Sequence, residues 1–447
     1  MEINPAIFKA YDIRGKYPGE INETAAYNIG RSFVGFLGIR TPKIAVGRDN
    51  RLSSPSIFKS FSQGLVDAGA QVVNLGLATS PLLYFAVAHY GLDGGINITA
   101  SHNPPEFNGF KMVKSGSVPI SETSGILEIK KMALAGSFGE KLKGKISQKD
   151  ALKDYVDFNL QEVNLKALKP LKIVVDTANA VSGIVIPLIF KKTPFKIYHI
   201  FKKLDGSFPN HLPDPLVEEN LQGLRAQVLV KKADLGIAFD GDGDRLFFID
   251  EKGEIVKPDL ITALVSQMIL EEHPGAKILY DIRSGRIIKE TVENLGGQAI
   301  LGRVGHSFIK EKMRQENIFF AGELSAHYYL ASNAFCEAPF FVAFKILEKM
   351  SKTGQSLSSL VFPFKKYFHS GEINFRVQDK AAKIKEIEGR YQIGEQSHLD
   401  GYRVDFSDWW FNVRPSNTEN LLRLTMEANT QELLEEKKKE LSALIQS

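Results

Sequence analysis

The sequence predicts an α/β protein: three α/β units followed by one smaller C-terminal α+β unit. A chain of 447 residues is long enough for two to four domains. Short apolar strands alternate with helices of about ten to fifteen residues, which indicates βαβ units and mixed, mainly parallel sheets. This alternation starts three times, and after a helix ending near Phe364 it gives way to a pattern typical of antiparallel strands.

The first unit begins at 6–15 with a short strand that runs into a polar turn. Further strands are expected at 43–46, 71–75 and 94–99, and helices at 54–68 and 80–89. Ser54 and Pro55 predict the start of the first of these helices, because serine is favoured at the N-cap and proline at the first helical position.

The later units follow the same reasoning. In the second, helices are expected at 149–160, 181–190 and 215–229, and strands at 172–175 and 235–239. Asp214 and Pro215 predict the start of the helix at 215–229. In the third, helices are expected at 260–269, 284–294, 306–313 and 340–350, and strands at 277–280, near 299 and at 318–321. The last unit combines strands at 372–376 and across 404–411 with a charged helix at 430–445. We therefore predict domains at 1–149, 150–251, 252–362 and 363–447.

Composition excludes several classes of protein. With 43% hydrophobic and 24% charged residues, the chain has the balance of a globular protein. Its 56 basic and 52 acidic residues give a net charge of +4, which does not favour nucleic acid as a partner. A single cysteine, Cys336, excludes an intramolecular disulfide. Neither a secretory signal nor an apolar run long enough for a membrane span is visible, so we expect a cytoplasmic protein.

A serine, a histidine and a lysine come at and just after the end of the strand 94–99. Ser101 and His102 follow this strand directly, and Lys111 is close behind. Ligands of open α/β sheets bind at strand ends, so Ser101 is a candidate phosphoacceptor, with His102 and Lys111 able to bind phosphate or move a proton. The G-x-S-x-G frame of hydrolase nucleophiles is absent. A serine that only caps the turn is the simpler interpretation of this stretch taken alone.

Three aspartates, Asp240, Asp242 and Asp244, alternate with glycines after the strand 235–239. Two like charges at about 4 Å repel by roughly 4 kcal/mol at an effective dielectric of 20, so three converging carboxylates need a cation. Hard oxygen ligands select Mg²⁺ or Ca²⁺. A calcium EF-hand does not fit, because Arg245 replaces the required glycine and strands flank the loop. We therefore predict a Mg²⁺ site rather than a solvated acidic turn.

Two later loops are rich in polar side chains. In 322–327, Glu323, Ser325 and His327 occupy alternating positions, which would let them bind a polyol, although on this pattern alone a solvated polar loop is the favoured interpretation. The loop 413–420 offers a guanidinium, two hydroxyls and an amide, a set suited to phosphate. Those residues are Arg414, Ser416, Thr418 and Asn417. An ordinary polar turn is the alternative.

Taken together, these loops resemble those of the α-D-phosphohexomutase superfamily, nearest to the bacterial phosphomannomutase/phosphoglucomutase group. The matching motifs are 10–15, 47–49, 99–104, 240–245, 305–306, 322–327 and 414–419. The resemblance covers essentially the whole chain. It implies three related α/β domains and a smaller C-terminal α+β domain around a central cleft.

The resemblance also implies roles for individual residues. Ser101 would be the phosphoserine, and one of its phosphate oxygens would hold Mg²⁺ together with Asp240, Asp242 and Asp244. The catalytic group around it would be His102, Lys111, Arg245 and His327, with Lys111 and His327 as candidates for proton transfer. Substrate would be bound by Tyr11, Arg14, Arg283, Gly305, His306, Glu323, Ser325, Arg414, Ser416, Asn417 and Thr418.

The implied activity is interconversion of hexose 1-phosphate and hexose 6-phosphate, with mannose and/or glucose as the sugar. The reaction would use phosphoserine, with hexose 1,6-bisphosphate as activator and intermediate. Because both O1 and O6 are phosphorylated, the bisphosphate must turn over between two transfers, which requires a fixed donor and a separate phosphate clamp. A phosphosugar is the expected partner of a monomer or small homo-oligomer that binds neither nucleic acid nor membrane.

Two departures from the family pattern bear on the sugar. Ala326 stands where the family commonly has glycine, and the segment 333–339 lacks an acidic Asp-Gly pattern. Phosphoglucosamine mutase is the alternative activity, although that subgroup commonly carries a polar residue in place of Leu324. A phosphosugar-binding protein without turnover is the alternative from another class, and the intact Ser101 and aspartates argue against it.

Overall fold

The computed structural model describes residues 3–140, 142–416 and 421–447. The chain divides into two compact units, of which the first contains residues 1–256 and 325–360 and the second residues 257–324 and 361–447. The first unit is thus built from two stretches that are separate in the sequence. Among the described residues, no helix has both the length and the apolar run that crossing a membrane requires.

The first sheet of unit 1 has seven strands in the order β1-β5-β4-β2-β3-β7, with β6 paired to β5. Their bounds are β1 Ile13–Lys16, β2 Lys43–Arg48, β3 Gln71–Leu77, β4 Gly94–Ile98, β5 Phe107–Lys114, β6 Val118–Pro119 and β7 Lys145–Gln148. The sheet is mixed, because β2 pairs in parallel with β3 and β4, and β5 pairs antiparallel to β1, β4 and β6. The sequence did not predict β5, whose Asn, Gly and Lys residues are poor strand formers.

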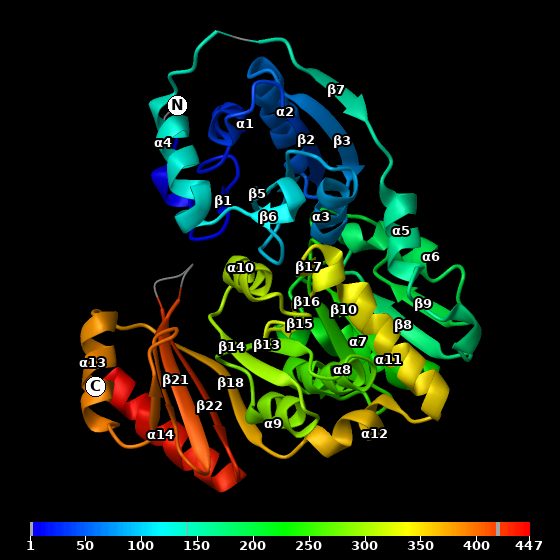
Figure 1. Cartoon of the computed structure of the whole chain (residues 1–447), viewed down its shortest axis with the longest axis vertical. Helices are drawn as coiled ribbons and strands as arrows, with labels where there is room; N and C mark the ends of the chain where they lie inside the picture. Colours follow the sequence, from blue (N-terminus) through cyan, green and yellow to red (C-terminus); the bar gives the residue numbers. More distant parts are fainter. Residues whose placement is uncertain (1–2, 141, 417–420) are drawn as a thin grey trace. The chain divides into compact units, whose positions relative to one another are not determined.

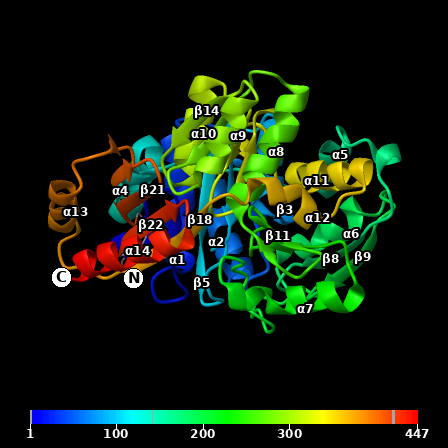
Figure 2. The ribbon, with the colours of Figure 1, turned by 90° about the horizontal axis from the view of Figure 1, so that it is seen from below.

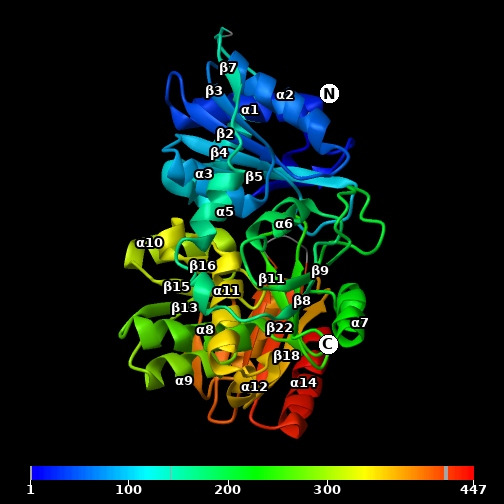
Figure 3. The same cartoon turned by 90° about the vertical axis from the view of Figure 1, so that its right-hand side faces the viewer.

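Helices cover both faces of this sheet. Its helices are α1 Glu23–Leu37, α2 Ser54–Asp67, α3 Ser80–His89 and α4 Leu127–Ala135. Residues of α1, α2 and α4 share one apolar cluster with strand residues such as Val46 and Ile96, whereas α3 packs on the other face, where Val87 approaches Gly95 (Figure 3). The prediction that Ser54 caps α2 was wrong, since Ser53 is the N-cap and the Ser54 hydroxyl donates to Asp49 at 2.6 Å.

The second sheet of unit 1 has the order β12-β11-β10-β8-β9. Its bounds are β8 Lys172–Asp176, β9 Lys196–Ile200, β10 Leu235–Phe239, β11 Leu246–Asp250 and β12 Ile255–Val256. Strands β9, β8 and β10 are parallel, whereas β10 and β11 form an antiparallel hairpin in which Phe239 pairs with Leu246. The aspartate loop is the turn of this hairpin. The remaining elements of unit 1 are α5 Leu152–Leu160, α6 Ile186–Ile189, α7 Gln222–Lys231, β16 Tyr328–Leu330, β17 Cys336–Glu337, α11 Pro339–Thr353 and α12 Leu357–Val361.

Two predicted helices of this region were too long. The stretch 181–190 is a 3-10 turn at Val181–Ile184 followed by the single turn α6, which contains Pro187, a residue without an N–H to donate. In 215–229 the helix starts only with a 3-10 turn at Glu218, and the Asp214 carboxylate accepts from the Leu216 N–H at 3.2 Å. Asp-Pro forms turns as readily as helix starts, and here the turn prevails.

Unit 2 begins with three parallel strands, with β13 between β14 and β15. The elements are α8 Pro258–Glu272, β13 Lys277–Asp281, α9 Arg286–Asn294, β14 Gln298–Gly302, α10 His306–Glu316 and β15 Phe320–Gly322. Helices α8 and α9 lie side by side (Figures 1 and 2). The predicted third α/β unit also included residues 325–362, of which 325–360 belong to unit 1 in the structure.

The C-terminal sheet is antiparallel throughout, in the order β18-β22-β21-β20-β19. Its elements are β18 Phe368–Phe375, α13 Lys380–Arg390, β19 Glu395–Ser397, β20 Tyr402–Asp405, β21 Trp409–Pro415, β22 Leu422–Ala428 and α14 Gln431–Gln446. Alternate residues such as Phe411 and Leu424 pack against α13 and α14. The intervening residues, among them Glu372, Arg414 and Arg423, therefore belong to the opposite face. The prediction of an antiparallel α+β unit is confirmed.

Candidate active site

Ser101 lies in the loop that joins β4 to β5. Its N–H donates to the Thr99 hydroxyl at 2.9 Å, and its backbone takes φ 51°, a left-handed conformation that is rare outside glycine. The side chain is buried, and Oγ donates to Oδ2 of Asp240 at 2.7 Å. His102 Nδ1 is 3.4 Å from the same Oγ. The structure therefore brings the candidate phosphoacceptor directly to the aspartate loop.

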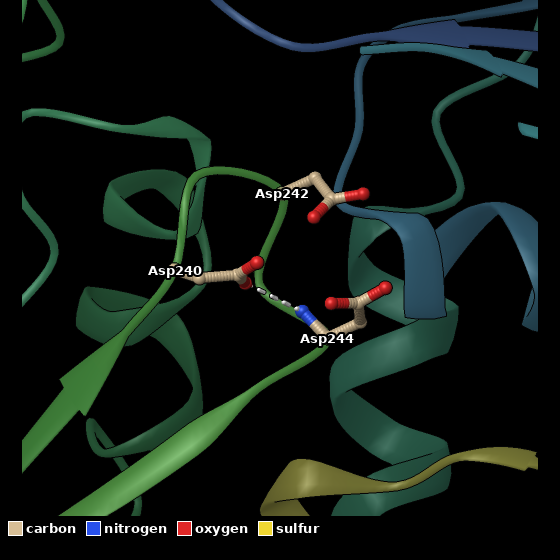
Figure 4. Close-up of side chains that lie close together, drawn as sticks. All are labelled: Asp240, Asp242 and Asp244. Atoms are coloured by element: carbon tan, nitrogen blue, oxygen red, sulfur yellow. Dashed lines mark hydrogen bonds between the residues drawn. The ribbon is translucent and has the colours of Figure 1, made fainter. Parts of the chain in front are cut away.

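The three aspartates of the β10–β11 turn are buried and converge. Each offers one carboxylate oxygen to a group in which all lie within 4.8 Å of one another, and Figure 4 shows the three side chains pointing toward a common space. Oδ1 of Asp240 also accepts the backbone N–H groups of Gly243, Asp244 and Arg245 at 3.0, 3.1 and 3.3 Å. The side chain of Asp240 therefore stabilises the turn to which Asp240 belongs.

Steric constraints explain why the two residues between the aspartates are glycines. A Cβ on Gly241 would lie 2.1 Å from the carbonyl oxygen of Ser101, so only glycine lets the two loops touch. Gly243 has φ 73°, which glycine adopts without strain. The alternation of aspartate and glycine is thus set by the close approach of two loops and by the tight turn.

Lys111 supplies the positive charge of the site. Its Nζ lies 2.7 Å from Oδ2 of Asp242 and also contacts Oδ2 of Asp244. Burial, the largest influence, opposes the charge, but the carboxylates outweigh it and raise the pKa of Lys111. Burial, together with the charges of Asp244 and Asp242, raises the pKa of Asp240 well above its ordinary value.

The donor set fits a hard divalent cation. It consists of carboxylate oxygens with a hydroxyl beside them, as Mg²⁺ requires. Oδ1 of Asp242 is buried and has no hydrogen-bond partner among the described residues. A buried carboxylate oxygen without a partner is costly unless a cation or a donor joins it. These residues can therefore hold a metal ion.

Arg245 and His327 meet beside the triplet. Arg245 Nε donates to Nε2 of His327 at 3.4 Å, and that nitrogen lies 3.2 Å from Oδ1 of Asp244. Nδ1 of His327 is 2.9 Å from the Ser325 hydroxyl. Ala326 has φ 63°, a conformation that glycine adopts at less cost. The backbone here therefore suits the glycine that the family commonly has at this position.

Burial and then the charges of Arg245, Arg14 and Lys111 lower the pKa of His102 well below its ordinary value.

Arg14, predicted to bind substrate, is held by a side chain of the serine loop. It lies on β1 and donates to the Asn103 side chain and to Oδ2 of Asp12, the latter at 2.5 Å. Tyr11 precedes these residues and is half-buried. One end of the guanidinium is therefore fixed to the serine loop two residues after Ser101.

Sequence reasoning missed two residues that hold the site. Ser80, the first residue of α3, donates its hydroxyl to Oδ2 of Asp242 at 2.5 Å and its N–H to the Asp242 carbonyl at 2.9 Å, and Asn97 supports the hydroxyl at 3.0 Å. Arg51 hydrogen-bonds the carbonyl of Ser101 at 2.7 Å. In the sequence, Ser80 is marked only as the first residue of the predicted helix 80–89. The sole signal for Arg51 was its place two residues after Asp49 of the motif 47–49.

In unit 2, Arg283 joins several of the predicted substrate-binding residues. Its guanidinium binds Asp281 at 2.8 Å and lies 3.6 Å from Glu323 and 3.4 Å from Glu372. The N–H of Leu324 donates to Asp281 at 2.8 Å, which ties the loop after β15 to the end of β13. Gly305, with φ 130°, is the N-cap of α10, and His306 is its first residue.

Arg414 is buried on β21 and pairs with Glu372 at 2.8 Å. Directly opposite it in the sheet stands Arg423, which binds the other oxygen of Glu372 at 2.9 Å. Like charges facing each other across strands repel, so Glu372 is the counter-ion that allows this pair. Burial is the largest influence on Glu372, yet Arg283, Arg414 and Arg423 together lower its pKa. Ser416 donates its N–H to the Leu421 carbonyl at 2.9 Å, and the predicted residues Asn417 and Thr418 lie outside the described residues.

Four family models match the chain in order and cover most of its length. They are the phosphoglucomutase/phosphomannomutase alpha/beta/alpha domain I at residues 5–139, domain II at 153–253, domain III at 257–367 and the C-terminal domain at 372–444. The chain belongs to the phosphoglucomutase/phosphomannomutase family. The fold class predicted from the sequence is thereby confirmed as three α/β domains and a C-terminal domain.

Relatives of this phosphoglucomutase/phosphomannomutase family member match it from end to end. A phosphomannomutase of Salmonella montevideo is 39% identical over 456 residues, covering 99% of this chain and all of the relative. The crystal structure of a phosphoglucomutase/phosphomannomutase family protein from Burkholderia thailandensis superposes with a TM-score of 0.92 at 32% identity, covering 99% and 97% of the two chains. These relatives show that the chain is an enzyme, a phosphohexose mutase.

A more distant structure shares the fold alone. It is the N-acetylphosphoglucosamine mutase of Aspergillus fumigatus in complex with GlcNAc-6P and magnesium, 13% identical, with a TM-score of 0.58 and coverage of 100% of this chain and 95% of that one.

Proposed function

We propose that this enzyme interconverts the 1-phosphate and the 6-phosphate of mannose and/or glucose through a phosphoserine at Ser101 and a hexose 1,6-bisphosphate intermediate. The observation that carries the proposal is the buried Ser101 hydroxyl held 2.7 Å from Asp240 at the edge of the carboxylate triplet. A serine used only as a turn cap would not need three carboxylates and a lysine around it.

Asp240, Asp242, Asp244 and a phosphate oxygen on Ser101 would hold Mg²⁺. When bound, the ion neutralises charge on the phosphoryl group during transfer. The magnesium complex of the distant Aspergillus fumigatus mutase supports this choice of metal. Positive charge from this chain comes from Lys111, 2.7 Å from Asp242, and from Arg245, 3.9 Å from Asp240.

In the first transfer the sugar hydroxyl oxygen bonds to phosphorus while the bond from phosphorus to Ser101 Oγ breaks, and the hydroxyl proton passes to a base of the protein. In the second transfer Ser101 Oγ bonds to the phosphorus at the other end of the bisphosphate, the bond from that phosphorus to the sugar oxygen breaks, and the sugar oxygen takes up a proton. Lys111 and His327, which both contact Asp244, are the candidates for these proton transfers. Lys111, whose pKa is raised because the carboxylates outweigh burial, would donate the proton to the leaving oxygen, and His327 would accept the proton of the attacking hydroxyl. His102, whose pKa is lowered by burial, would face the phosphate as a neutral hydrogen-bonding group.

Residues of unit 2 would bind the rest of the substrate. The phosphate that is not reacting would be held by Arg414, Ser416, Asn417 and Thr418. Glu323, and Ser325 from unit 1, would bind sugar hydroxyls, and the other contacts would come from Tyr11, Arg14, Arg283, Gly305 and His306. Separate sites for the reacting and resting phosphates are what turnover of a bisphosphate requires.

The proposal is tested by a coupled assay of 6-phosphate formation. The enzyme, Mg²⁺ and a trace of hexose 1,6-bisphosphate are incubated with mannose 1-phosphate, glucose 1-phosphate or glucosamine 1-phosphate. We expect turnover of mannose 1-phosphate and/or glucose 1-phosphate, and a phosphate on Ser101 detected by peptide mass spectrometry. Preference for glucosamine 1-phosphate would replace the proposed substrate, and binding of all three without turnover would refute the proposed reaction.

Arg414→Gln should weaken the binding of every phosphosugar to a similar extent. A charge-assisted hydrogen bond to phosphate contributes about 1.5–3 kcal/mol, so KM should rise by about 10- to 100-fold for each active sugar. Steady-state kinetics on mannose 1-phosphate and glucose 1-phosphate measure this. Arg403→Gln is the matched control, because Arg403 is a buried arginine of the same sheet that binds Asp405 and the Ile282 carbonyl. An effect of Arg414→Gln on one sugar alone would contradict the clamp role.

A further inference from the structure

Arg51 is a fully buried arginine, 1% exposed, just after β2. Its Nη2 donates to the carbonyls of Ser101 and Asn103, both at 2.7 Å. Its Nη1 donates to the carbonyls of Pro104 and Phe107 at 2.6 and 3.0 Å. One guanidinium therefore binds four main-chain oxygens of the loop that presents Ser101.

The fifth donor completes the set. Nε of Arg51 donates to Oδ2 of Asp49 at 3.1 Å, and the N–H of Arg51 donates to Oδ1 at 3.0 Å. Asp49 is in turn fixed by the Ser54 hydroxyl at 2.6 Å. The guanidinium also lies over the ring of Phe208, 5.2 Å from its centroid. Arginine has five N–H groups, and all five have protein acceptors, so none is left for a phosphate.

The serine loop needs such a partner for two reasons. Buried carbonyl oxygens without hydrogen bonds are costly, and the turn directs four carbonyls at Arg51, of which that of Pro104 also accepts a backbone N–H, from Phe107 at 3.1 Å. Ser101 is also held in a left-handed conformation, which L-residues enter only against a steric penalty. The Ser101 carbonyl oxygen that Arg51 binds also lies close to Gly241 of the aspartate turn, where a Cβ would come within 2.1 Å of it. The loop is thus fixed between a guanidinium and the aspartate turn.

We propose that Arg51 is a positioning residue that sets the main-chain path of residues 101–107 and thereby aims Ser101 Oγ at the metal-binding carboxylates. It acts through the loop and touches neither phosphate nor sugar. The effect of Arg51 on the rate rests on the proposed phosphoserine function. Its effect on the main chain of residues 101–107 does not.

The first experiment compares Arg51→Ala and Arg51→Lys with wild type. A displacement of about 1 Å can cost about 10²-fold in rate, so kcat should fall by about 10²- to 10³-fold in Arg51→Ala while KM and the Mg²⁺ dissociation constant stay within about threefold. Lysine cannot reach four carbonyls in a plane, so Arg51→Lys should restore little activity. Added guanidinium ion should raise the rate of Arg51→Ala and leave wild type unchanged.

Arg225→Ala is the matched control. Arg225 also hydrogen-bonds a turn carbonyl, that of Gly253 at 2.7 Å, but this turn follows β11 and is not part of the site. It should keep wild-type kcat and show no response to guanidinium. Wild-type kcat in Arg51→Ala, or a loss of rate explained entirely by the unfolded fraction in a thermal melt, would overturn the inference.

A second measurement does not depend on activity. Amide hydrogen exchange of a peptide spanning 99–108 should be faster in Arg51→Lys than in wild type, with exchange in α3 unchanged. If Arg51→Ala fails to fold, Asp49→Asn, which weakens the support of the guanidinium, should show the same selective change and a fall in kcat without a rise in KM. Unchanged loop exchange would refute the positioning role. Absence of phosphoserine and turnover in wild type would instead refute the proposed function, leaving the exchange result to decide on Arg51.

Discussion

Ser101→Ala is expected to abolish turnover of every hexose phosphate that the wild type converts. The hydroxyl is the only group proposed to carry the phosphate, and loss of a nucleophile commonly lowers kcat by about 10⁴-fold or more. Binding of the sugar phosphate should persist, because the proposed clamp on Arg414 is untouched. The measurements are kcat in the coupled assay and substrate affinity by calorimetry.

Ser62→Ala controls for the loss of a buried serine hydroxyl. Ser62 is 1% exposed in α2 and belongs to no part of the site, so its variant should retain wild-type kcat. A Ser101→Ala enzyme that turned over at the wild-type rate would eliminate the phosphoserine mechanism. Intact-mass analysis should also show that the Ser101 variant never gains a phosphate.

Asp242→Asn is expected to lose Mg²⁺ affinity and, with it, activity. Its carboxylate contributes one of the three converging oxygens, and an amide oxygen is a weaker, uncharged ligand for a hard cation. We expect Mg²⁺ affinity to fall by at least about 100-fold, because mutation of residues that only hydrogen-bond the metal ligands can already lower affinity by about 10- to 100-fold. Titration of Mg²⁺ by calorimetry and activity as a function of Mg²⁺ concentration measure the effect.

Asp250→Asn is the matched control for that experiment. Asp250 is a buried aspartate at the other end of the same hairpin, where it accepts the N–H groups of Lys252 and Glu254 at 3.0 and 2.9 Å. Its variant should lower the melting temperature and leave Mg²⁺ affinity unchanged. Equal loss of affinity in both variants would mean that the triplet is not the metal site.

The parts of the fold that the sequence predicted are those with strong local patterns. The strand 235–239 and the helix 80–89 have the same bounds in the structure, because an unbroken apolar run and a Thr-Ser-Pro start leave few alternatives. Strand β5 was missed, since its residues favour a strand only when β1 and β4 lie on either side. The pairing of β5 depends on residues that are distant in the sequence, so local strand propensity does not predict it.

The site divides in the same way. The serine and aspartate motifs carry their chemistry in the residue types, but the pairing of Ser101 with Asp240 was implied only by the resemblance to the family. Arg51 and Ser80 could not be assigned from the sequence, because their roles depend on which carbonyl or carboxylate lies opposite after folding. Glu372 illustrates the same limit: it lies in an ordinary strand sequence, and only the sheet register makes it the partner of both Arg414 and Arg423.

The divided sequence of unit 1 has a consequence for how the protein is made. His327 lies 3.2 Å from Asp244, yet the whole stretch 257–324, which belongs to unit 2, is synthesised between them. A nascent chain that ends before residue 325 can form the serine and aspartate loops but not the hydrogen bond between Leu246 and Ala326 that joins the two stretches. Contacts of such high sequence separation form slowly. Completion of the catalytic unit therefore has to wait until residues 325–360 have been synthesised, and until then the growing chain exposes apolar surface to chaperones.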